Sequence, residues 1–460
     1  MSTAHSPQTY FGTDGIRGAA NGPVLNPGTI VRIGLATAQV VRKSSPHAHP
    51  TVVIGKDPRL SGYMIESALQ SAFTSMGFTV LLVGPLPTPA VAMLTRSLRC
   101  DIGVMITASH NLYEDNGIKL FTPDGIKANG NMVTEIEALV GSHGQIELCH
   151  ADHLGKAERL EDAVGRYMEY VKTSVPSSLR FDGLKVAIDC ANGAAYKIAP
   201  RIFWELGADV VSTGVAPNGV NINAKCGATY PQTVAELVKT SGAHVGIALD
   251  GDADRLIMAD EHGTVLDGDA ILAAMAAHLH KQGKLKGGAV VATVMSNMGL
   301  EEYLNGLGLK LIRTPVGDHY VEAAMREHGC NLGGEQSGHL IFRDFATTGD
   351  GILAALQVLS FLQEQGKPAS SLSNLFTKWP QVLENIKLPA GTNAAAVLES
   401  APVQAASAAA NSALGANGRT LVRKSGTEPL IRVMVEAREA GLRDSQCASI
   451  VAAVKAQVGL

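Results

Sequence analysis

The sequence predicts an α/β protein made of three related α/β domains and a smaller α+β domain at the C-terminus. With 460 residues the chain is too long for a single core, because domains usually hold about 100–200 residues. Hydrophobic residues make up 46% of the chain and aromatic residues only 5%, and such a composition suits buried strands rich in Val and Ala. A strand, a polar turn and a helical pattern also recur along the chain, which is typical of α/β domains.

This recurrent pattern appears in three places. The apolar runs at 51–62, 184–195 and 288–297 each end in a turn with Asp, Asn or Ser, and an amphipathic segment follows each of them. The repeats lie roughly 100–130 residues apart, and this spacing predicts domains over 1–155, 156–256 and 257–370. Residues 150–175 are expected to form a helical linker, and residues 252–271 a hairpin that leads into the third domain.

The pattern changes after residue 370. The segment 390–418 is rich in Ala and is predicted to be helical or a mobile insert, whereas residues 419–438 read as strand, loop and strand. These features predict a C-terminal α+β domain over 371–460.

Charge and cysteine content exclude several classes of function. The net charge is −4 and both signs are interspersed, so no basic stripe predicts nucleic-acid binding. No apolar run reaches the ~18 residues that a membrane span needs, and the first residues lack the features of a secretory signal. The six cysteines are scattered without a CxxC pair, so we expect reduced thiols and a cytoplasmic protein.

The first candidate site is Ser109, which follows the apolar run that ends at Thr107. A hydroxyl at the carboxyl end of a strand can face a ligand cleft, although a serine that closes a turn or caps a helix is the commoner interpretation. His110 and Asn111 could orient the loop, and Lys119 is close enough in sequence to return beside it. A cation there would stabilise a phosphate on the hydroxyl. The surroundings do not match the GxSxG pattern of hydrolases.

The second candidate is the run Asp250, Asp252 and Asp254 between two apolar strands. Alternate side chains of an extended loop point the same way, so we expect the carboxylates to converge and to bind Mg²⁺, which prefers oxygen ligands. Arg255 could pair with a phosphate oxygen. An EF-hand is excluded because Arg255 occupies the position that needs Gly. An aspartyl phosphatase with Asp250 as nucleophile stays possible on this loop alone.

Two further polar loops are candidates for ligand binding. Glu335, Ser337 and His339 alternate in a glycine-containing loop and could hold sugar hydroxyls, with His339 able to exchange a proton near neutral pH. A second loop near the C-terminus offers hydroxyls, backbone N–H groups and a guanidinium, which together suit a phosphate. Its members are Arg423, Ser425, Gly426 and Thr427. Each loop could equally be an ordinary polar turn.

Taken together and in this order, the motifs TASHN, DGDADR, GEQSGH and RKSGTEP resemble the series found in the α-D-phosphohexomutases. The resemblance extends over nearly the whole chain and includes YFGTDGIRG at 10–18, IGKDPRLSGYMIESAL at 54–69 and NINAKCGATY at 221–230. It implies three α/β domains with mixed sheets and a smaller C-terminal domain around a central active-site cleft.

The resemblance also implies roles for particular residues. Ser109 would be a phosphoserine that is required for activity, with one Mg²⁺ bound by Asp250, Asp252, Asp254 and the Ser109 phosphate. Glu335 and Ser337 would bind sugar hydroxyls, while Lys119 and His339 match positions linked to proton handling. The remaining site residues implied are His110 and Arg17 near the reacting groups, Arg255 on the substrate, and Arg423, Ser425, Gly426 and Thr427 on its distal phosphate.

The implied reaction interconverts glucosamine 6-phosphate and glucosamine 1-phosphate through a 1,6-bisphosphate, and it supplies amino-sugar nucleotides for cell-wall precursors. The expected partner is a phosphosugar, and the protein is expected to be a monomer or a homodimer. Glucose or mannose phosphates are the alternative substrates within the family. Outside this reaction, a Mg²⁺-dependent aspartyl phosphatase and a non-catalytic sugar-phosphate sensor remain alternatives.

Overall fold

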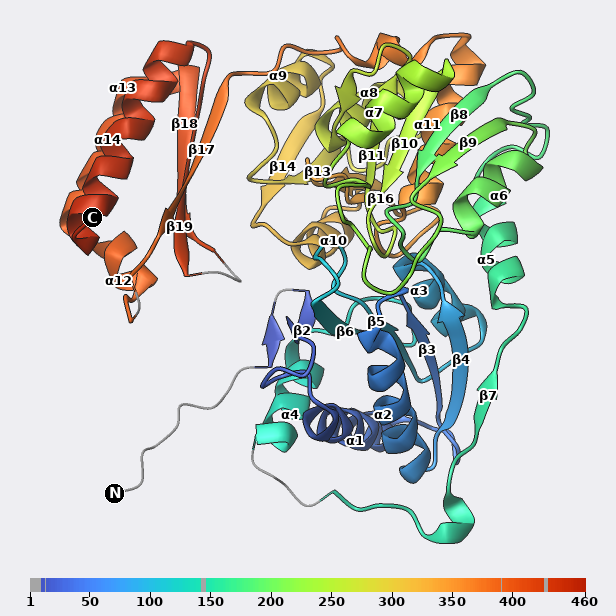
Figure 1. Cartoon of the computed structure of the whole chain (residues 1–460). Coiled ribbons are helices and arrows are strands. Elements are labelled where there is room, and N and C mark those ends of the chain that lie inside the picture. The colour runs from blue at the N-terminus through green and yellow to red at the C-terminus, as the bar shows by residue number, and fades with distance from the viewer. Residues whose placement is uncertain (1–9, 13, 142–145, 390, 426–428) are drawn as a thin grey trace, which may run out of the picture. The chain divides into compact units, whose positions relative to one another are not determined.

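A computed structural model describes residues 10–12, 14–141, 146–389, 391–425 and 429–460. The chain forms two compact units (Figure 1). The first unit comprises Met1–Met295 and Leu309–Leu375, and the second comprises Ser296–Gly308 and Phe376–Leu460. The domain boundaries predicted near residues 155, 256 and 370 stay predictions.

The first unit begins with a seven-stranded mixed sheet of order β1-β2-β6-β5-β3-β4-β7. Its strands are β1 (Phe11–Gly12), β2 (Gly15–Ala19), β3 (Thr51–Lys56), β4 (Thr79–Pro85), β5 (Ile102–Ile106), β6 (Asp115–Phe121) and β7 (Ala157–Arg159). Its helices are α1 (Pro27–Ser44), α2 (Ser61–Ser75), α3 (Thr88–Ser97) and α4 (Gly130–Gly141).

The two faces of this sheet are covered by different helices. Alternate strand residues such as Ile54 and Val104 join the core formed with α1, α2 and α4. Gly55 and Gly103 point the other way, where a Cβ atom would collide with Val91 and Thr95 of α3. The glycines therefore let α3 approach the sheet closely.

The second sheet has five strands in the order β12-β11-β10-β8-β9 and is also mixed. It contains β8 (Lys185–Asp189), β9 (Asp209–Thr213), β10 (Val245–Leu249), β11 (Leu256–Asp260) and β12 (Val265–Leu266). Around it lie α5 (Ala163–Lys172), α6 (Ile198–Glu205) and α7 (Gln232–Ser241). The core on one face joins α7 to Ala248, Ile257 and Ala259.

The third sheet has four strands in the order β14-β13-β15-β16. It contains β13 (Ala289–Thr293), β14 (Lys310–Thr314), β15 (Leu332–Gly334) and β16 (Leu340–Phe342). Its helices are α8 (Gly268–Lys281), α10 (Asp318–Glu327) and α11 (Gly351–Gln365). Helix α11 contacts β10 and β11 as well as β16, so it joins the second and third sheets.

The second unit is built on an antiparallel sheet of order β17-β19-β18. It contains β17 (Gln381–Lys387), β18 (Gly418–Lys424), β19 (Leu430–Ala437), α12 (Ala394–Glu399), α13 (Ala401–Leu414) and α14 (Ala440–Val458). It also contains α9 (Met298–Gly306), whose first N–H donates to Glu436 Oε1 (2.8 Å). The helical interpretation of the Ala-rich segment and the strand–loop–strand prediction are both confirmed.

The three predicted strand–turn–helix repeats are confirmed as β3 with α2, β8 with α6, and β13 with α9. The hairpin prediction also holds, because β11 pairs antiparallel with β12. The helical linker is wrong before residue 163. There, Ala151–His153 form a 3₁₀ turn and β7 pairs with β4, whose edge of the first sheet would otherwise be open.

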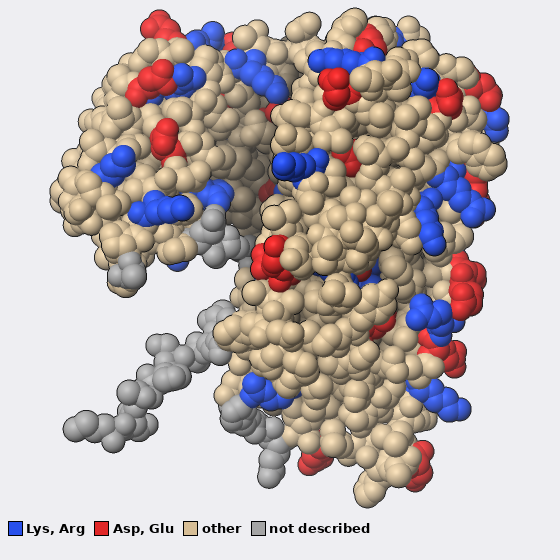
Figure 2. All heavy atoms as spheres, viewed as in Figure 1, with Lys and Arg blue, Asp and Glu red and all other residues tan. Residues whose placement is uncertain are grey.

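The surfaces are polar and mixed in sign. Figure 2 shows acidic and basic side chains interspersed over the viewed face of each unit. Among the described helices, none has the length and the apolar character that a membrane crossing requires.

A buried hydrogen bond ties α5 to the start of α11. Tyr167 Oη donates to the Asp350 carboxylate, with 2.9 Å to each oxygen, and Asp350 caps α11 by accepting from the N–H groups of Ile352 and Leu353. Burial raises the pKa of Asp350 to about 6 in spite of these three donors. The Tyr167 hydroxyl thus helps a buried carboxylate to stay ionised at neutral pH.

We expect Tyr167→Phe to lower the free energy of unfolding by about 1.5–3 kcal/mol, because a buried carboxylate loses a charged hydrogen bond. Urea unfolding at pH 7.5, followed by circular dichroism, measures this loss. Tyr170→Phe is the matched control, since Tyr170 lies on the same helix and donates to the carbonyl of the exposed Phe345. Equal losses in the two variants would contradict the buried-carboxylate explanation.

Candidate active site

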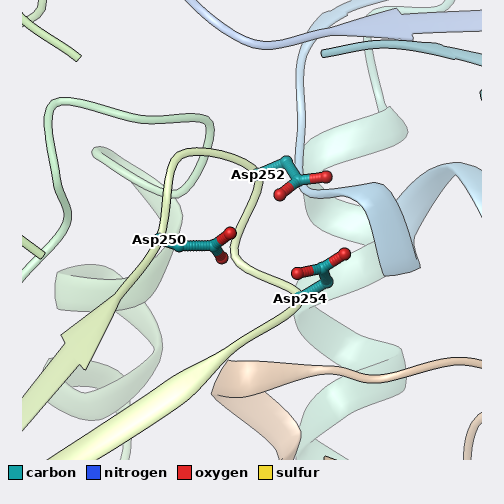
Figure 3. Close-up of side chains that lie close together, drawn as sticks. All are labelled: Asp250, Asp252 and Asp254. Atoms are coloured by element: carbon teal, nitrogen blue, oxygen red, sulfur yellow. The ribbon is translucent and has the colours of Figure 1, made fainter. Parts of the chain in front are cut away.

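A turn between β10 and β11 gathers three carboxylates (Figure 3). Asp250, Asp252 and Asp254 are buried there, and each offers an oxygen within 4.8 Å of the others. The extended loop expected from their alternation is wrong. The chain turns back at this point, because the Ala253 N–H donates to the Asp250 carbonyl (3.0 Å) and Ala253 has φ 57°. The turn, rather than strand alternation, makes the carboxylates converge.

The charges in this turn suit a hard cation. Burial together with repulsion from Asp254 and Asp252 raises the pKa of Asp250 well above its ordinary value. Oδ1 of Asp252 and Oδ1 of Asp254 are buried and accept no hydrogen bond from the described residues. Unpaired buried carboxylate oxygens are costly, and a divalent cation with oxygen ligands would satisfy them. The three residues therefore fit a metal site.

Ser109 faces this turn from the loop after β5. Its Oγ donates to Asp250 Oδ2 (2.6 Å), and the residue is almost fully buried. The turn-closing role that a serine often plays falls instead to Thr107, whose Oγ1 accepts from the Ser109 N–H (2.8 Å). Ser109 has φ 52°, a left-handed conformation that costs a non-glycine residue about 1–3 kcal/mol. The fold thus holds a strained backbone in order to aim this hydroxyl at the carboxylates.

A buried arginine, Arg59, holds the loop that carries Ser109. Arg59 is fully buried, pairs with Asp57 (Nε to Oδ2, 2.8 Å) and donates to the carbonyls of Ser109 (2.9 Å) and Asn111 (2.8 Å). Asp57 also accepts from Thr107 Oγ1 (2.7 Å), although burial raises its pKa above the ordinary value. The loop is therefore fixed by charge-assisted hydrogen bonds.

Lys119 reaches the carboxylates from β6, where it pairs with Met105 of β5. Its Nζ lies 2.7 Å from Asp252 Oδ2 and 3.0 Å from Asp254 Oδ2. Burial by itself would lower the pKa of Lys119, but the neighbouring carboxylates hold it well above its ordinary value. Lys119 is consequently a permanent cation in this structure.

Asp14 extends the charged network around Lys119. Asp14 Oδ2 is 3.7 Å from Lys119 Nζ, and Asp14 also forms ion pairs with Arg17 and Lys127. Burial would raise the pKa of Asp14, but these three cations hold it well below its ordinary value. Lys127 pairs in turn with Asp318 at the start of α10. This chain of ion pairs connects the first sheet to the third.

His110 and Arg255 complete the surroundings of Ser109. His110 Nδ1 lies 3.3 Å from Ser109 Oγ, and the nearby Arg255 guanidinium, burial and Arg17 lower the pKa of His110 to about 3. His110 is therefore neutral at physiological pH. The Arg255 backbone N–H donates to Asp250 Oδ1 (3.2 Å), and Arg255 forms an isolated β-bridge with His339.

The loop between β15 and β16 carries Glu335, Ser337 and His339. Ser337 Oγ donates to Glu335 Oε2 (3.1 Å), and the Gly317 N–H donates to Glu335 Oε1 (3.2 Å). His339 is buried, with Nε2 3.5 Å from Asp318 Oδ2. The β-bridge to Arg255 brings this loop next to the turn of Asp250, Asp252 and Asp254, which we call the metal turn because its carboxylates fit a cation.

The predicted phosphate loop lies in the second unit. Arg423 is near the end of β18, and the Ser425 N–H donates to the Leu430 carbonyl (2.9 Å) across the hairpin. Gly426 and Thr427 lie outside the described residues. The role of these four residues stays a prediction.

Several site residues were not singled out from the sequence. Asp14 and Arg59 lie in the quoted stretches 10–18 and 54–69, but a single Asp or Arg in a loop carries no specific signal. Thr88, at the first turn of α3, donates to Asp252 through Oγ1 and through its backbone N–H. Asp57 and Asn223 also lie in quoted stretches, 54–69 and 221–230, but were not singled out there. Lys127 and Asp318 were missed as well, and the contacts of all four are recognisable only once the sheets are assembled.

Family comparisons cover nearly the whole chain. Profiles described as phosphoglucomutase/phosphomannomutase alpha/beta/alpha domains I, II and III match residues 8–147, 165–263 and 267–379, and that of the C-terminal domain matches 383–453. A phosphoglucosamine mutase of Rhodospirillum centenum is 57% identical over 452 residues, covering 97% of this chain and 95% of its own. That of Caulobacter vibrioides is 54% identical over 451 residues, covering 98% and 100%.

Solved structures share the fold. A phosphoglucomutase/phosphomannomutase family protein from Burkholderia thailandensis superposes with a TM-score of 0.82 at 23% identity, covering 98% of each chain. Aspergillus fumigatus N-acetylphosphoglucosamine mutase, in complex with GlcNAc-6P and magnesium, gives a TM-score of 0.66 at 19% identity and covers 98% of this chain and 96% of its own. The four matched domains and the full-length relatives lead to one conclusion: the chain belongs to the phosphoglucomutase/phosphomannomutase family.

Proposed function

We propose that the chain is a phosphoglucosamine mutase that interconverts glucosamine 6-phosphate and glucosamine 1-phosphate. The observation that carries this proposal is the Ser109 hydroxyl, which is held 2.6 Å from one of three clustered carboxylates. The substrate is inferred from relatives of 57% and 54% identity that are named for this activity. Such an enzyme supplies the precursor of amino-sugar nucleotides used in cell-wall synthesis.

Asp250, Asp252 and Asp254 are the proposed ligands of one Mg²⁺. Their oxygens match its preference for hard ligands, and the Oδ1 atoms of Asp252 and Asp254, which accept no hydrogen bond from the described residues, are the ones proposed to bind it. When bound, the ion acts as a Lewis acid that neutralises negative charge on phosphoryl oxygens. The Ser109 phosphate is the proposed fourth protein ligand.

Ser109 is proposed to carry the transferable phosphoryl group on Oγ. In the forward direction, the 1-hydroxyl of glucosamine 6-phosphate attacks the phosphorus, the bond from phosphorus to Ser109 Oγ breaks, and the proton of the hydroxyl passes to a base. The product is glucosamine 1,6-bisphosphate. The intermediate then reorients, Ser109 Oγ attacks the phosphorus of its 6-phosphate, and the bond from that phosphorus to the 6-oxygen breaks. The 6-oxygen takes up the proton that the base accepted, so that glucosamine 1-phosphate leaves and the phosphoserine is restored.

The charged residues have distinct proposed roles in this cycle. Lys119, held protonated by its carboxylate neighbours, stabilises charge on the transferring group as a cation. His110 and Arg17 are proposed to lie near the transferring phosphoryl group, and Arg255 is proposed to contact the substrate. Because Lys119 is a poor base in this environment, His339 is the better of the two predicted proton carriers.

The remaining groups are proposed to bind the sugar hydroxyls and the distal phosphate of the substrate. Glu335 and Ser337 are hydrogen-bonded to each other and are proposed to bind sugar hydroxyls. The distal phosphate is assigned to Arg423, Ser425, Gly426 and Thr427. A cytoplasmic location is consistent with six free cysteines, and the choice between monomer and homodimer stays a prediction.

An aspartyl phosphatase is less well supported. The Ser109 hydroxyl lies 2.6 Å from Asp250 Oδ2, where a phosphatase would have to bind phosphorus, and the full-length relatives are named as mutases. Glucose and mannose phosphates stay the alternative substrates within the family.

We expect Ser109→Gly to abolish mutase turnover, by roughly 10⁴-fold or more, as removal of a covalent nucleophile does. Glycine tolerates the left-handed backbone at this position, so the loop should persist. Intact-protein mass spectrometry should show one phosphoryl adduct on the wild type that the variant lacks. Ser71→Ala, an exposed serine on α2, is the control and should keep both the adduct and the activity. Full turnover in Ser109→Gly would refute the phosphoserine mechanism.

We expect Asp252→Asn to weaken Mg²⁺ binding by more than the 10–100-fold that loss of an outer-shell partner costs, because it removes a directly bound carboxylate. Isothermal titration of the purified protein with MgCl₂ measures the affinity without reference to activity. Asp209→Asn, which removes an exposed carboxylate on β9, is the control and should titrate like the wild type. Unchanged affinity in Asp252→Asn would place the metal elsewhere.

We expect kcat/KM to be highest for glucosamine 6-phosphate among the 6-phosphates of glucosamine, glucose and mannose. Initial rates at saturating Mg²⁺, with a trace of the matching 1,6-bisphosphate to keep Ser109 phosphorylated, give this ranking. A higher kcat/KM for glucose or mannose phosphate would reassign the substrate while leaving the family and the reaction type intact.

A further inference from the structure

Two backbone carbonyls of the Ser109 loop are held by donors from two different sheets. Asn223 Nδ2 donates to the Ser109 carbonyl (2.9 Å) and to the Asn111 carbonyl (2.8 Å). Arg59 donates to the same two oxygens, at 2.9 Å and 2.8 Å. A carbonyl oxygen has two lone pairs, so these donors saturate both acceptors.

The orientation of the Asn223 amide follows from chemistry. Both neighbours are carbonyl oxygens, which can only accept, so the NH₂ group must face them and both of its hydrogens are used. Asn223 is itself buried and held in a left-handed conformation (φ 56°), with its backbone N–H donating to the Ala191 carbonyl (2.9 Å). The amide is thus fixed from the second sheet, on the connection between β9 and α7.

The metal turn packs against the same point. A Cβ atom at Gly251 would lie 2.4 Å from the Ser109 carbonyl oxygen and 2.8 Å from Asn223 Nδ2. Asn223 therefore lies where the Ser109 loop and the carboxylate turn meet. A displacement of the Ser109 backbone at this carbonyl would carry Oγ with it, because both are attached to one Cα.

We propose that Asn223 is a positioning residue that holds the left-handed Ser109 loop against the metal turn and so aligns Ser109 Oγ for phosphoryl transfer. Asn223 acts through the two carbonyls and does not touch the substrate. This inference rests on the proposed function of Ser109. It assigns to the 221–230 segment a role in the rate of transfer rather than in substrate binding.

Two variants test this role while preserving the backbone. Asn223→Asp keeps the shape but forces a carboxylate oxygen against two carbonyl oxygens. Asn223→Gly keeps the left-handed conformation without strain and deletes both donors. We expect kcat to fall by roughly 100-fold in Asn223→Asp and about 10-fold in Asn223→Gly, the scale of a small misplacement of reacting groups. KM for the sugar phosphate should stay within about 2-fold, since sugar and distal-phosphate contacts lie elsewhere.

Hydrogen exchange supplies a readout that is independent of turnover. Amides of residues 107–115 should exchange faster in both variants than in the wild type, with Asn223→Asp the faster of the two. The control is Asn221→Asp, which makes the same change two residues away, where the amide donates to the Ala216 carbonyl (3.1 Å). It should leave kcat and the exchange of 107–115 at wild-type values.

The outcomes separate this inference from the proposed function. Wild-type kcat and exchange in Asn223→Asp overturn it. The inference is also overturned if Asn221→Asp loses kcat to the same extent. It is overturned likewise if the loss of kcat comes with a proportional rise in KM or fall in melting temperature, because the loss then reflects general stability. If the wild type instead prefers another hexose phosphate, the substrate assignment fails. The kcat and KM of the Asn223 variants are then compared with those of the wild type on that substrate. If the wild type turns over no hexose phosphate, the mutase proposal fails and exchange alone decides whether Asn223 holds the loop.

Discussion

Repulsion among three buried carboxylates is the constraint on which the first unit depends. Asp250, Asp252 and Asp254 lie within one turn, where water screens their charges little. The fold balances their charge with Lys119 from β6 and with the Thr88 hydroxyl, which donates to the Asp252 carboxylate at the N-terminus of α3, where the helix dipole favours negative charge. Elements of the first sheet must therefore close onto a turn of the second. The carboxylate oxygens that accept no hydrogen bond from the described residues after this closure are the ones that suit a cation.

Ser109 shows how strain is used at the centre of the site. An unconstrained serine would leave its left-handed conformation, but Arg59 and Asn223 hold the carbonyl of this residue from two sides. The Asp57 carboxylate in turn fixes Arg59 and Thr107. Because these partners are buried and the hydrogen bonds of Arg59 and Asp57 are charge-assisted, the hydroxyl is placed before any substrate arrives. Such preorganisation lowers the cost of reaching a reactive geometry.

Charge also links the surroundings of Ser109 to the loop that carries Glu335, Ser337 and His339. Lys127 pairs with Asp14 in the first sheet and with Asp318 at the start of α10, and Asp318 lies beside His339. The Gly317 N–H, one residue before Asp318, donates to Glu335. Groups proposed to transfer phosphate and groups proposed to bind the sugar therefore share one network. A change in the position of α10 would therefore move both its contact with Lys127 and its contacts with His339 and Glu335.

The sequence by itself determined the α/β class, the three strand–turn–helix repeats and the motif residues Ser109, Asp250, Asp252 and Asp254, because local periodicity and closely spaced polar residues are visible in one dimension. It also placed the C-terminal hairpin of β18 and β19. Tertiary structure alone decided that the carboxylates converge through a turn at Ala253 rather than along a strand, and that residues 157–159 complete the first sheet. It likewise decided the roles of Arg59, Asn223 and Lys127. The contacts of Arg59 with Ser109, of Asn223 with Ser109 and of Lys127 with Asp318 join residues 50, 114 and 191 positions apart, and such long-range pairing leaves no local pattern to read.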